Sequence, residues 1–155
     1  MEPIEKKILG TYDELEKDAL DLHTLFEFVG GNPPAQREAV LDAATRLQKQ
    51  GLLEEDSGGD FYRRTEAGRV AVAGPRDVTF YSRPGCHLCE EAKAAIVPLL
   101  KEFGARLREV NIDEDPRLRE LYTNDVPVVF LGSRKVAKHR LDVNQFRKQL
   151  EQAGR

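Results

Sequence analysis

Cys86 and Cys89, the two cysteines of the chain, are separated by two residues in the stretch Tyr81-Ser82-Arg83-Pro84-Gly85-Cys86-His87-Leu88-Cys89. The residues before them, Asp77–Ser82, are β-branched and aromatic as in a strand, and Pro84-Gly85 breaks that strand. After them, apolar residues recur at spacings of three and four, which predicts a helix with one buried face: Leu88, Ala92, Ala95, Ile96, Leu99 and Phe103. The spacing therefore places Cys86 at the N-terminus of a helix.

A cysteine at a helix N-terminus favours its thiolate form, with a pKa of roughly 3.5 to 7.5 instead of about 8.5, and Arg83 adds positive charge nearby. A structural zinc site needs four ligands, and the three histidines, His23, His87 and His139, lack the spacing of such a site, so we predict no metal. A permanent disulfide across so short a loop would stabilise the fold little. Reversible dithiol exchange is the interpretation that remains, with two inert buried thiols as its alternative.

The length of 155 residues suits one ordinary domain or two small ones, and 40% hydrophobic residues are enough for globular cores. No apolar run is long enough to span a membrane, and the first residues do not resemble a signal peptide. We therefore expect a cytoplasmic protein without a membrane partner. In that compartment a pair of nearby cysteines is more often catalytic or metal-binding than a permanent crosslink.

The net charge of −3 is unevenly distributed. Residues 1–75 carry nine Lys and Arg against fifteen Asp and Glu, a balance of −6, whereas residues 76–155 carry fifteen against twelve, a balance of +3. Gly74-Pro75 between them has the composition of a linker. We predict two domains, residues 1–74 and 76–155.

The first domain is expected to be mostly helical. Thr11 and Glu14 form a capping box, and the apolar residues that follow predict an amphipathic helix through Val29. Ile4, Ile8 and Leu9 before it indicate a shorter leading helix. A second helix is expected from Pro33-Pro34 to Gly51, with four residues facing inward: Val40, Leu41, Ala44 and Leu47. The period then changes to that of a β-hairpin, formed by Leu52-Leu53 and the segment Phe61-Tyr62-Arg63-Arg64, and Thr65 begins a last helical turn.

Over residues 11–73 this pattern resembles the winged-helix domains of bacterial regulators. The resemblance implies candidate phosphate contacts from the basic residues of the helix and hairpin: Arg37, Arg46, Lys49, Arg63 and Arg64. The acidic balance, with Glu54-Glu55 on the wing itself, opposes binding to a polyanion. We therefore predict an interaction or self-association module with a protein partner, and not DNA.

The second domain reads as an α/β fold with the order β-α-β-α-β-β-α. After the cysteine helix, which contains Pro98 and ends near Gly104, a strand is expected at Arg106–Ile112 and a helix that Asp115 and Pro116 begin. Two strands, Val128–Leu131 and Lys135–His139, precede a final helix capped by Asp142. The expected inward residues of the two later helices are Leu118, Leu121 and Tyr122, and Val143, Phe146 and Leu150.

Over residues 76–153 the order, the cysteine motif and Val126-Pro127 before the third strand resemble glutaredoxins of the thioredoxin-like superfamily, especially the short proteins with Cys-His-Leu-Cys. The resemblance implies that Cys86 is the nucleophile and Cys89 the resolving thiol. It also implies that Arg83 stabilises the thiolate and meets a glutathione carboxylate, and that Val126-Pro127 is a cis step that pairs with substrate. Asp142 would hold the γ-glutamyl end of glutathione.

This sequence departs from the glutaredoxin pattern twice. Asp125 stands where a threonine is usual, and Lys138-His139-Arg140 precedes Leu141-Asp142 where the family has Gly-Gly. Glutathione is thus less firmly implied than dithiol chemistry. His87, between the cysteines, is a second candidate for stabilising the thiolate, and its alternative is an exposed residue without a role.

The sequence therefore predicts a glutaredoxin-like thiol-disulfide oxidoreductase acting through Cys86 and Cys89. Its expected substrates are disulfide-bearing proteins or glutathione mixed disulfides, with no tightly bound cofactor and glutathione as the candidate co-substrate. One alternative is a redox-responsive winged-helix DNA-binding regulator. Another is a binding module whose cysteine site is vestigial or holds an iron–sulfur cluster through Cys86 and glutathione.

Overall fold

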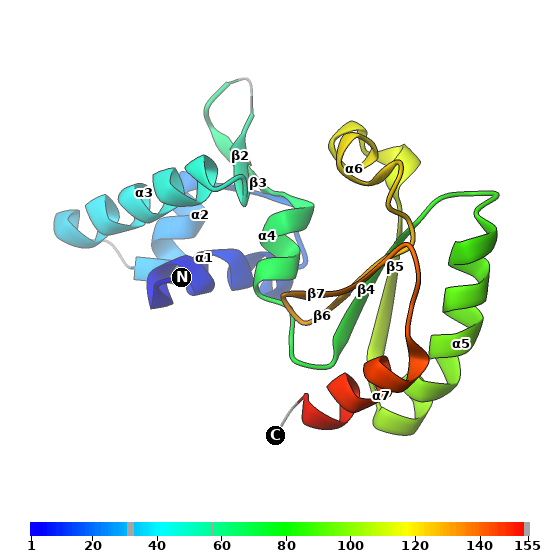
Figure 1. Ribbon diagram of the computed structural model, residues 1–155. Coiled ribbons are helices and arrows are strands. Elements are labelled where there is room, and N and C mark those ends of the chain that lie inside the picture. Colours follow the sequence, from blue (N-terminus) through cyan, green and yellow to red (C-terminus); the bar gives the residue numbers. More distant parts are fainter. Residues whose placement is uncertain (31–32, 57, 154–155) are drawn as a thin grey trace. The chain divides into compact units, whose positions relative to one another are not determined.

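The computed structural model describes residues 1–30, 33–56 and 58–153, and it divides into two compact units, residues 1–72 and 73–155 (Figure 1). The division falls close to the predicted linker at Gly74-Pro75. Each unit has its own sheet.

The first unit combines helices with a small antiparallel sheet of order β1-β3-β2. Its elements are α1 (Pro3–Glu14), β1 (Ala19–Asp21), α2 (Leu22–Leu25), the π-helical η1 (Phe26–Gly30), α3 (Pro34–Lys49), β2 (Leu53–Glu55), β3 (Phe61–Arg64) and α4 (Glu66–Ala71). The predicted hairpin is confirmed as β2 and β3, which pair through Leu53–Arg64 and Glu55–Tyr62. The predicted last helix is confirmed as well, because the Thr65 side chain accepts a hydrogen bond from the Gly68 N–H at 3.0 Å.

The predicted helix from Thr11 to Val29 is wrong. The helix begins instead at Pro3, where Glu2 and Glu5 form the capping box, and it ends at Glu14. Thr11 lies inside this helix and its hydroxyl donates to the Lys7 carbonyl at 2.7 Å, so it caps nothing.

A strand that the sequence pattern did not reveal interrupts the expected helix. Ala19, Leu20 and Asp21 pair antiparallel with Arg63, Tyr62 and Phe61 of β3. The Asp21 carboxylate then accepts the Thr24 N–H at 2.7 Å and begins α2. Backbone pairing with a distant strand and a new helix cap together outweigh the local helical periodicity.

The predicted helix α3 is confirmed, with Pro34 as its first residue and Gly51, at φ 74°, just beyond its end. Val40, Ala44 and Leu47 are buried as expected, but Leu41 is exposed and Ala43 takes its place in the core.

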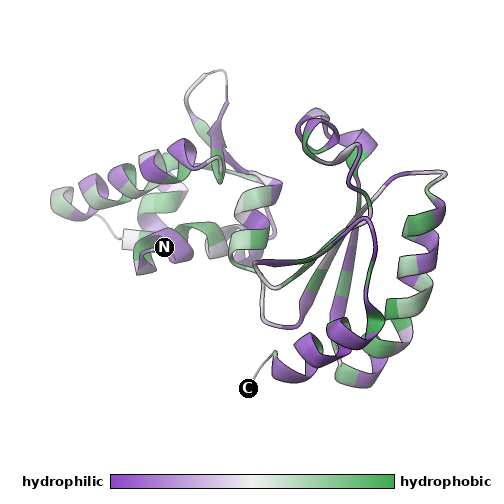
Figure 2. Ribbon diagram, viewed as in Figure 1, coloured by the Kyte–Doolittle hydropathy of each residue, from purple (hydrophilic) through white to green (hydrophobic). Residues whose placement is uncertain are grey.

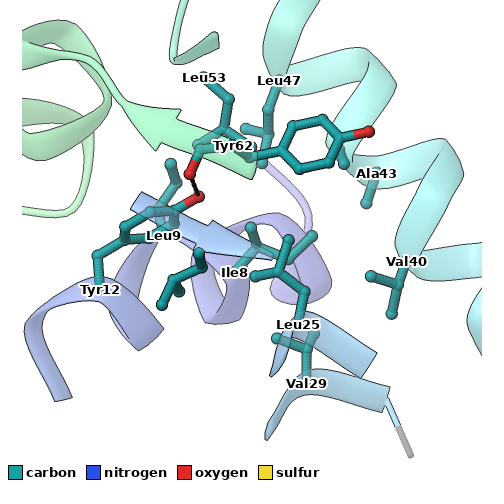
Figure 3. Packing of buried hydrophobic residues seen from close by; sticks show 12 residues of the cluster. Ile8, Leu9, Tyr12, Leu25, Val29, Val40, Ala43, Leu47, Leu53 and Tyr62 are labelled. Atoms are coloured by element: carbon teal, nitrogen blue, oxygen red, sulfur yellow. Dashed lines mark hydrogen bonds between the residues drawn. The ribbon is translucent and has the colours of Figure 1, made fainter. Parts of the chain in front are cut away.

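The core of the first unit lies between α1, α3 and the sheet (Figure 3). The buried ring of Tyr12 projects from α1 and its hydroxyl donates to the Tyr62 carbonyl of β3 at 2.8 Å, which joins helix and sheet. Burial raises the pKa of Tyr12 above its ordinary value of 10. The side chain therefore remains a neutral hydrogen-bond donor at ordinary pH.

Two of the candidate phosphate contacts are used inside the first unit. Arg64 is buried, its guanidinium makes two hydrogen bonds to the Asp13 carboxylate, and it also donates to the Leu9 carbonyl at 2.8 Å. Arg46 donates to the buried Glu5 carboxylate at 2.7 Å. The expectation that Arg64 could contact a nucleic acid is therefore wrong, and the Arg46 side chain is tied to α1.

The second unit is built on a four-stranded mixed sheet of order β5-β4-β6-β7. Its elements are β4 (Asp77–Ser82), α5 (His87–Phe103), β5 (Arg106–Asn111), the 3₁₀ turn η2 (Ile112–Glu114), α6 (Pro116–Tyr122), β6 (Val128–Leu131), β7 (Arg134–Lys138) and α7 (Val143–Gln152). Parallel β5 and antiparallel β6 flank β4, and α5 packs against α7 (Figure 1). Each predicted strand and helix of this unit has an observed counterpart, and the strand Asp77–Ser82 has the predicted bounds.

The apolar faces of this unit differ from expectation mainly near helix ends. Ala92, Ile96 and Leu99 of α5 are buried, but Leu88 in its first turn is exposed. The helix continues through Pro98 and ends at Gly104 with φ 63°. Leu121 of α6 and Val143 of α7 are exposed, against expectation. The helix α7 is mostly hydrophilic in Figure 2, and its buried side chains are Phe146 and Leu150.

No helix within residues 1–30, 33–56 and 58–153 is both long enough and apolar enough to cross a lipid bilayer.

Candidate functional site

Cys86 and Cys89 lie at the N-terminus of α5, and the structure joins them in a disulfide. Cys86 is the N-cap residue, and its sulfur accepts a hydrogen bond from the Cys89 N–H at 3.1 Å. Cys86 is partly exposed, whereas Cys89 is buried. In the reduced protein the same N–H and the helix dipole would face a sulfur anion on Cys86.

The loop before the helix gives Cys86 this position. After the last residue of β4, Ser82, the chain turns through Arg83, Pro84 and Gly85, and Gly85 has the left-handed φ of 77° that favours glycine. The Glu90 N–H donates to the Cys86 carbonyl at 3.1 Å, which begins the helix. Strand, turn and N-cap thus fix the backbone on both sides of the cysteine.

Arg83 forms an ion pair with Asp113 of η2, with 2.8 Å between Nη2 and Oδ1. Asp113 follows β5, which runs parallel to β4, so the two loops leave the sheet at the same edge. The sequence predicts that the positive charge of Arg83 stabilises the Cys86 thiolate. The Asp113 carboxylate offsets part of that charge. Sequence reasoning missed Asp113, because no local pattern relates residues thirty positions apart.

His87 points away from the protein, with its side chain 93% exposed. Its Nδ1 lies 3.9 Å from the Glu90 carboxylate, one helical turn further along α5. The neighbouring Leu88 is also exposed. These two side chains therefore form part of the surface that borders Cys86.

Val126 and Pro127 are brought to the same edge of the sheet as the cysteines. Their peptide bond is cis, as the family resemblance implied. They directly precede β6, whose first residue, Val128, pairs with Tyr81 near the end of β4. The end of β4 and the start of β6 are thus adjacent in the sheet.

The two departures from the glutaredoxin pattern lie against one another. The His139 N–H donates to the carbonyl oxygens of Asp125 at 2.9 Å and Pro127 at 3.0 Å. The Lys138 ammonium lies 3.6 Å from the Asp125 carboxylate. His139 has a φ of 69°, a conformation that glycine adopts more readily than histidine does. The segment after β7 is therefore held to the segment that contains Pro127.

Asp142 is the N-cap residue of α7, and its carboxylate accepts the Gln145 N–H at 3.1 Å. The predicted capping role is confirmed. The residue is exposed, so one of its oxygens can cap the helix while the other faces solvent.

Tyr81 and Tyr122 form an aromatic contact beside the site, with ring centroids 5.1 Å apart. Tyr81 is buried and also meets the edge of the Phe130 ring. Burial raises the pKa of Tyr122, and the Asp125 carboxylate acts in the same direction. The contact of the two tyrosine rings joins α6 to β4 beside the site.

The polar side chains of Ser82, Lys93 and Glu109 form a cluster near the cysteine loop that the sequence did not predict. The Glu109 carboxylate accepts from the Ser82 hydroxyl at 3.2 Å and from the Lys93 ammonium at 2.5 Å. This cluster ties α5 to the neighbouring strands β4 and β5. Over the residues that the structure describes, no group of three or more His, Cys, Asp or Glu side chains could hold a metal ion.

Residues 77–151 match the family described as Glutaredoxin-like domain (DUF836). A curated relative, "Glutaredoxin-like protein YDR286C homolog" from Dictyostelium discoideum, is 33% identical over 81 residues, which cover 48% of this chain and 75% of the relative. Among solved structures, protein Ne2328 from Nitrosomonas europaea is 38% identical, with a TM-score of 0.41 over 45% of this chain and 85% of that one. Protein XcR50 from X. campestris is 32% identical, with a TM-score of 0.41 over 49% of this chain and 97% of that one.

Proposed function

Because the chain belongs to the glutaredoxin-like domain (DUF836) family, we propose that its second unit is a thiol-disulfide oxidoreductase with Cys86 as nucleophile and Cys89 as resolving thiol. The observation that carries the proposal is the placement of the partly exposed residue Cys86 at the N-terminus of α5, next to the buried Cys89. We assign the contact with substrate to Cys86 because this residue is the more exposed of the two, and the resolving step to the buried Cys89.

The cycle follows from this placement. The Cys86 thiolate attacks one sulfur of a substrate disulfide, a mixed disulfide forms, and the other substrate sulfur leaves as a thiolate that takes a proton from solvent. The Cys89 thiolate then attacks the Cys86 sulfur and releases the second substrate sulfur. Two electrons have passed to the substrate, and the protein holds the Cys86–Cys89 disulfide. A thiol or dithiol reductant restores the pair, and glutathione is our candidate.

The surrounding residues have proposed roles in the same cycle. The N–H groups of the first turn of α5 stabilise the leaving and attacking sulfur anions, and Arg83, although paired with Asp113, adds positive charge at the rim. Val126 and Pro127, which are buried at the edge of the sheet near the cysteines, are the proposed contact for the substrate chain. Asp142 is the proposed contact for the amino end of glutathione, and His87 is a proposed electrostatic partner of the sulfur anion.

The first unit is proposed to be a winged-helix-like interaction module. The segment α2–η1 precedes α3 as the helix before the recognition helix does in such domains, and β2–β3 form the wing. The acidic balance of residues 1–75 and the internal use of Arg46 and Arg64 support a protein partner or self-association in preference to DNA.

Two variants test the oxidoreductase proposal. We expect Cys86→Ser to abolish reduction of a disulfide substrate, and Cys89→Ser to accumulate a covalent mixed disulfide through Cys86 that mass spectrometry detects. Glu91→Gln, an exposed change on the same helix, is the control and should retain the full rate. Unchanged reduction by the Cys86→Ser protein would refute the proposal.

A further inference from the structure

The segment Lys138-His139-Arg140, here called the basic turn, lies at the same edge of the sheet as the cysteines. Tyr81 of β4 pairs with Val128 of β6, and Val128 pairs in turn with Lys138 of β7. The end of β4, the start of β6 and the end of β7 are therefore neighbours across the sheet. The loop that contains Cys86 follows the end of β4, and the basic turn lies at the end of β7.

The basic turn has a fixed backbone. The His139 N–H donates to two carbonyl oxygens, those of Asp125 and Pro127, and the Arg140 N–H donates to the Lys138 carbonyl at 2.8 Å. The two segments are also joined by the ion pair of Lys138 with Asp125. A turn held in this way presents its side chains at a set position beside Pro127, at a small cost in conformational entropy when a ligand binds.

The turn also has positive charge that the protein does not neutralise. Lys138 is balanced by Asp125, but Arg140 is exposed and forms no ion pair with any residue in the described ranges. The nearest acidic residue along the chain, Asp142, directs a carboxylate oxygen to the Gln145 N–H. An exposed guanidinium binds a carboxylate through two parallel hydrogen bonds. Arg140 is thus an available contact for a carboxylate of an approaching molecule.

We propose that the basic turn selects protein substrates whose disulfide is flanked by acidic residues, with Arg140 as the principal contact. The proposal rests on the oxidoreductase function proposed above, since the substrate disulfide must reach Cys86 while its flanking residues reach the turn. Within the second unit the charge balance of +3 over residues 76–155 favours an acidic partner, whereas the whole chain has a net charge of −3, so the attraction is local to this unit. The contact is solvent-exposed, so its effect falls as salt concentration rises.

The test compares two peptides of equal length in which one cysteine forms a mixed disulfide with uncharged 2-thiopyridine. Acidic residues flank the cysteine in one peptide, and lysines replace them in the other. We expect Arg140→Glu in the full-length protein to lower kcat/KM for the acidic peptide by about 3- to 10-fold at low salt, measured by thiopyridone release, and to raise it for the lysine peptide. The difference should disappear in about 1 M salt.

Lys101→Glu is the matched control, because it makes the same change in net charge at the other end of α5. Fifteen residues from Cys86 along a helix correspond to about 22 Å, beyond the screening length of about 10 Å at 0.1 M salt. Lys101→Glu should change kcat/KM for neither the acidic nor the lysine peptide. Equal losses on both peptides, or a loss confined to a glutathione mixed disulfide, would overturn the proposal.

A binding measurement separates this proposal from the oxidoreductase function. The acidic peptide with serine in place of cysteine should bind the wild-type protein at low salt and should bind Arg140→Glu more weakly by a similar factor, as followed by NMR shifts of the basic turn. This result can hold even if no peptide disulfide is reduced. Absence of binding in a protein that does reduce both peptides would refute charge selection and leave the oxidoreductase proposal standing.

Discussion

Arg64 is a buried cation of the first unit whose partners come from a distant segment of the chain. Its side chain is 3% exposed, pairs with the Asp13 carboxylate, donates to the Leu9 carbonyl and lies over the Tyr12 ring. Its Nε has no hydrogen-bond partner within the described part of the chain. The guanidinium therefore joins β3 to α1 by several contacts that one smaller side chain cannot replace.

We predict that Arg64→Ala lowers the free energy of unfolding of the first unit by about 2–4 kcal/mol, because it removes the hydrogen bonds to the Asp13 carboxylate and the Leu9 carbonyl and opens a cavity beside Tyr12. The neighbouring Arg63→Ala, on the exposed side of the same strand, should change it by less than about 0.5 kcal/mol. Hydrogen exchange of the β1 and β3 amides at increasing denaturant concentration measures the free energy of unfolding of each variant. Equal effects of the two substitutions would contradict the structural role of Arg64.

Glu5 is a buried carboxylate at the start of α1 that makes the first unit sensitive to acid. The hydrogen bond from Arg46 lowers the pKa of Glu5 below its ordinary value of 4.5. A carboxylate with a lower pKa in the folded state stabilises the fold above the unfolded value, and this contribution is lost as pH falls through the folded value.

We therefore predict that Glu5→Gln destabilises the first unit at neutral pH and that the difference from wild type shrinks below about pH 4.5. Denaturant midpoints between about pH 7 and pH 3 measure this. Glu14→Gln, an exposed change at the other end of the same helix, should have no such pH dependence. A constant difference between Glu5→Gln and wild type across this range would show that Glu5 contributes by packing alone.

At the scale of elements, the contact between α4 and the segment before β2 depends on a glycine. A Cβ on Gly68 would overlap the Leu52 carbonyl, which accepts the Thr65 N–H at 3.1 Å. Gly10, in the interior of α1, has no heavy atom within 4 Å of the position that its Cβ would occupy. The same substitution should therefore have opposite effects in the two helices.

We predict that Gly68→Ala lowers the free energy of unfolding by about 2 kcal/mol or more, because α4 must move away from Leu52. Gly10→Ala should raise it by about 0.5–1 kcal/mol, since alanine restricts the unfolded chain and suits a helix interior. Thermal unfolding of the two variants, measured in parallel, gives the comparison. A stabilising Gly68→Ala would show that the described packing of α4 is incorrect.

The elements that sequence predicted correctly are those with signals of their own. Asp115 and Pro116 begin α6, Gly104 ends α5, and the apolar run Val128–Leu131 is a buried strand. The strand β1 has no such signal, because three residues join the sheet only through pairing with β3, some forty positions later. Periodicity also failed for Leu88, Leu121 and Val143, which lie in the first or last turn of their helices, where the buried stripe leaves the core.

The candidate site shows the same division. Its central pair, Cys86 and Cys89, and the cis step at Pro127 follow from short motifs and the family resemblance. The contacts that surround them, Arg83 with Asp113 and Lys138 with Asp125, depend on which strands are neighbours in the sheet. The sequence was therefore enough to predict the reacting sulfur atoms. Predicting the ion pairs around them requires knowing which strands are neighbours.

At the scale of the whole molecule, the two units carry opposite charge balances, −6 for residues 1–75 and +3 for residues 76–155. A redox-responsive DNA-binding regulator would need the acidic unit to approach a polyanion, and two of its candidate contacts are held internally by Glu5 and Asp13. Clustered, available cations supply most non-specific DNA affinity. The structure offers few of them on this unit.

We predict that the full-length protein does not bind duplex DNA measurably at about 50 mM salt, whether the Cys86–Cys89 pair is reduced or oxidised. Fluorescence anisotropy with a labelled random-sequence duplex measures this in both redox states. A triple variant, Glu54→Lys, Glu55→Lys and Asp60→Lys, converts the hairpin to a basic wing and should gain salt-sensitive binding, which establishes that the assay detects a basic module. Tight, redox-dependent binding by the wild-type protein would instead establish the first unit as a DNA-binding regulator controlled by the cysteine pair.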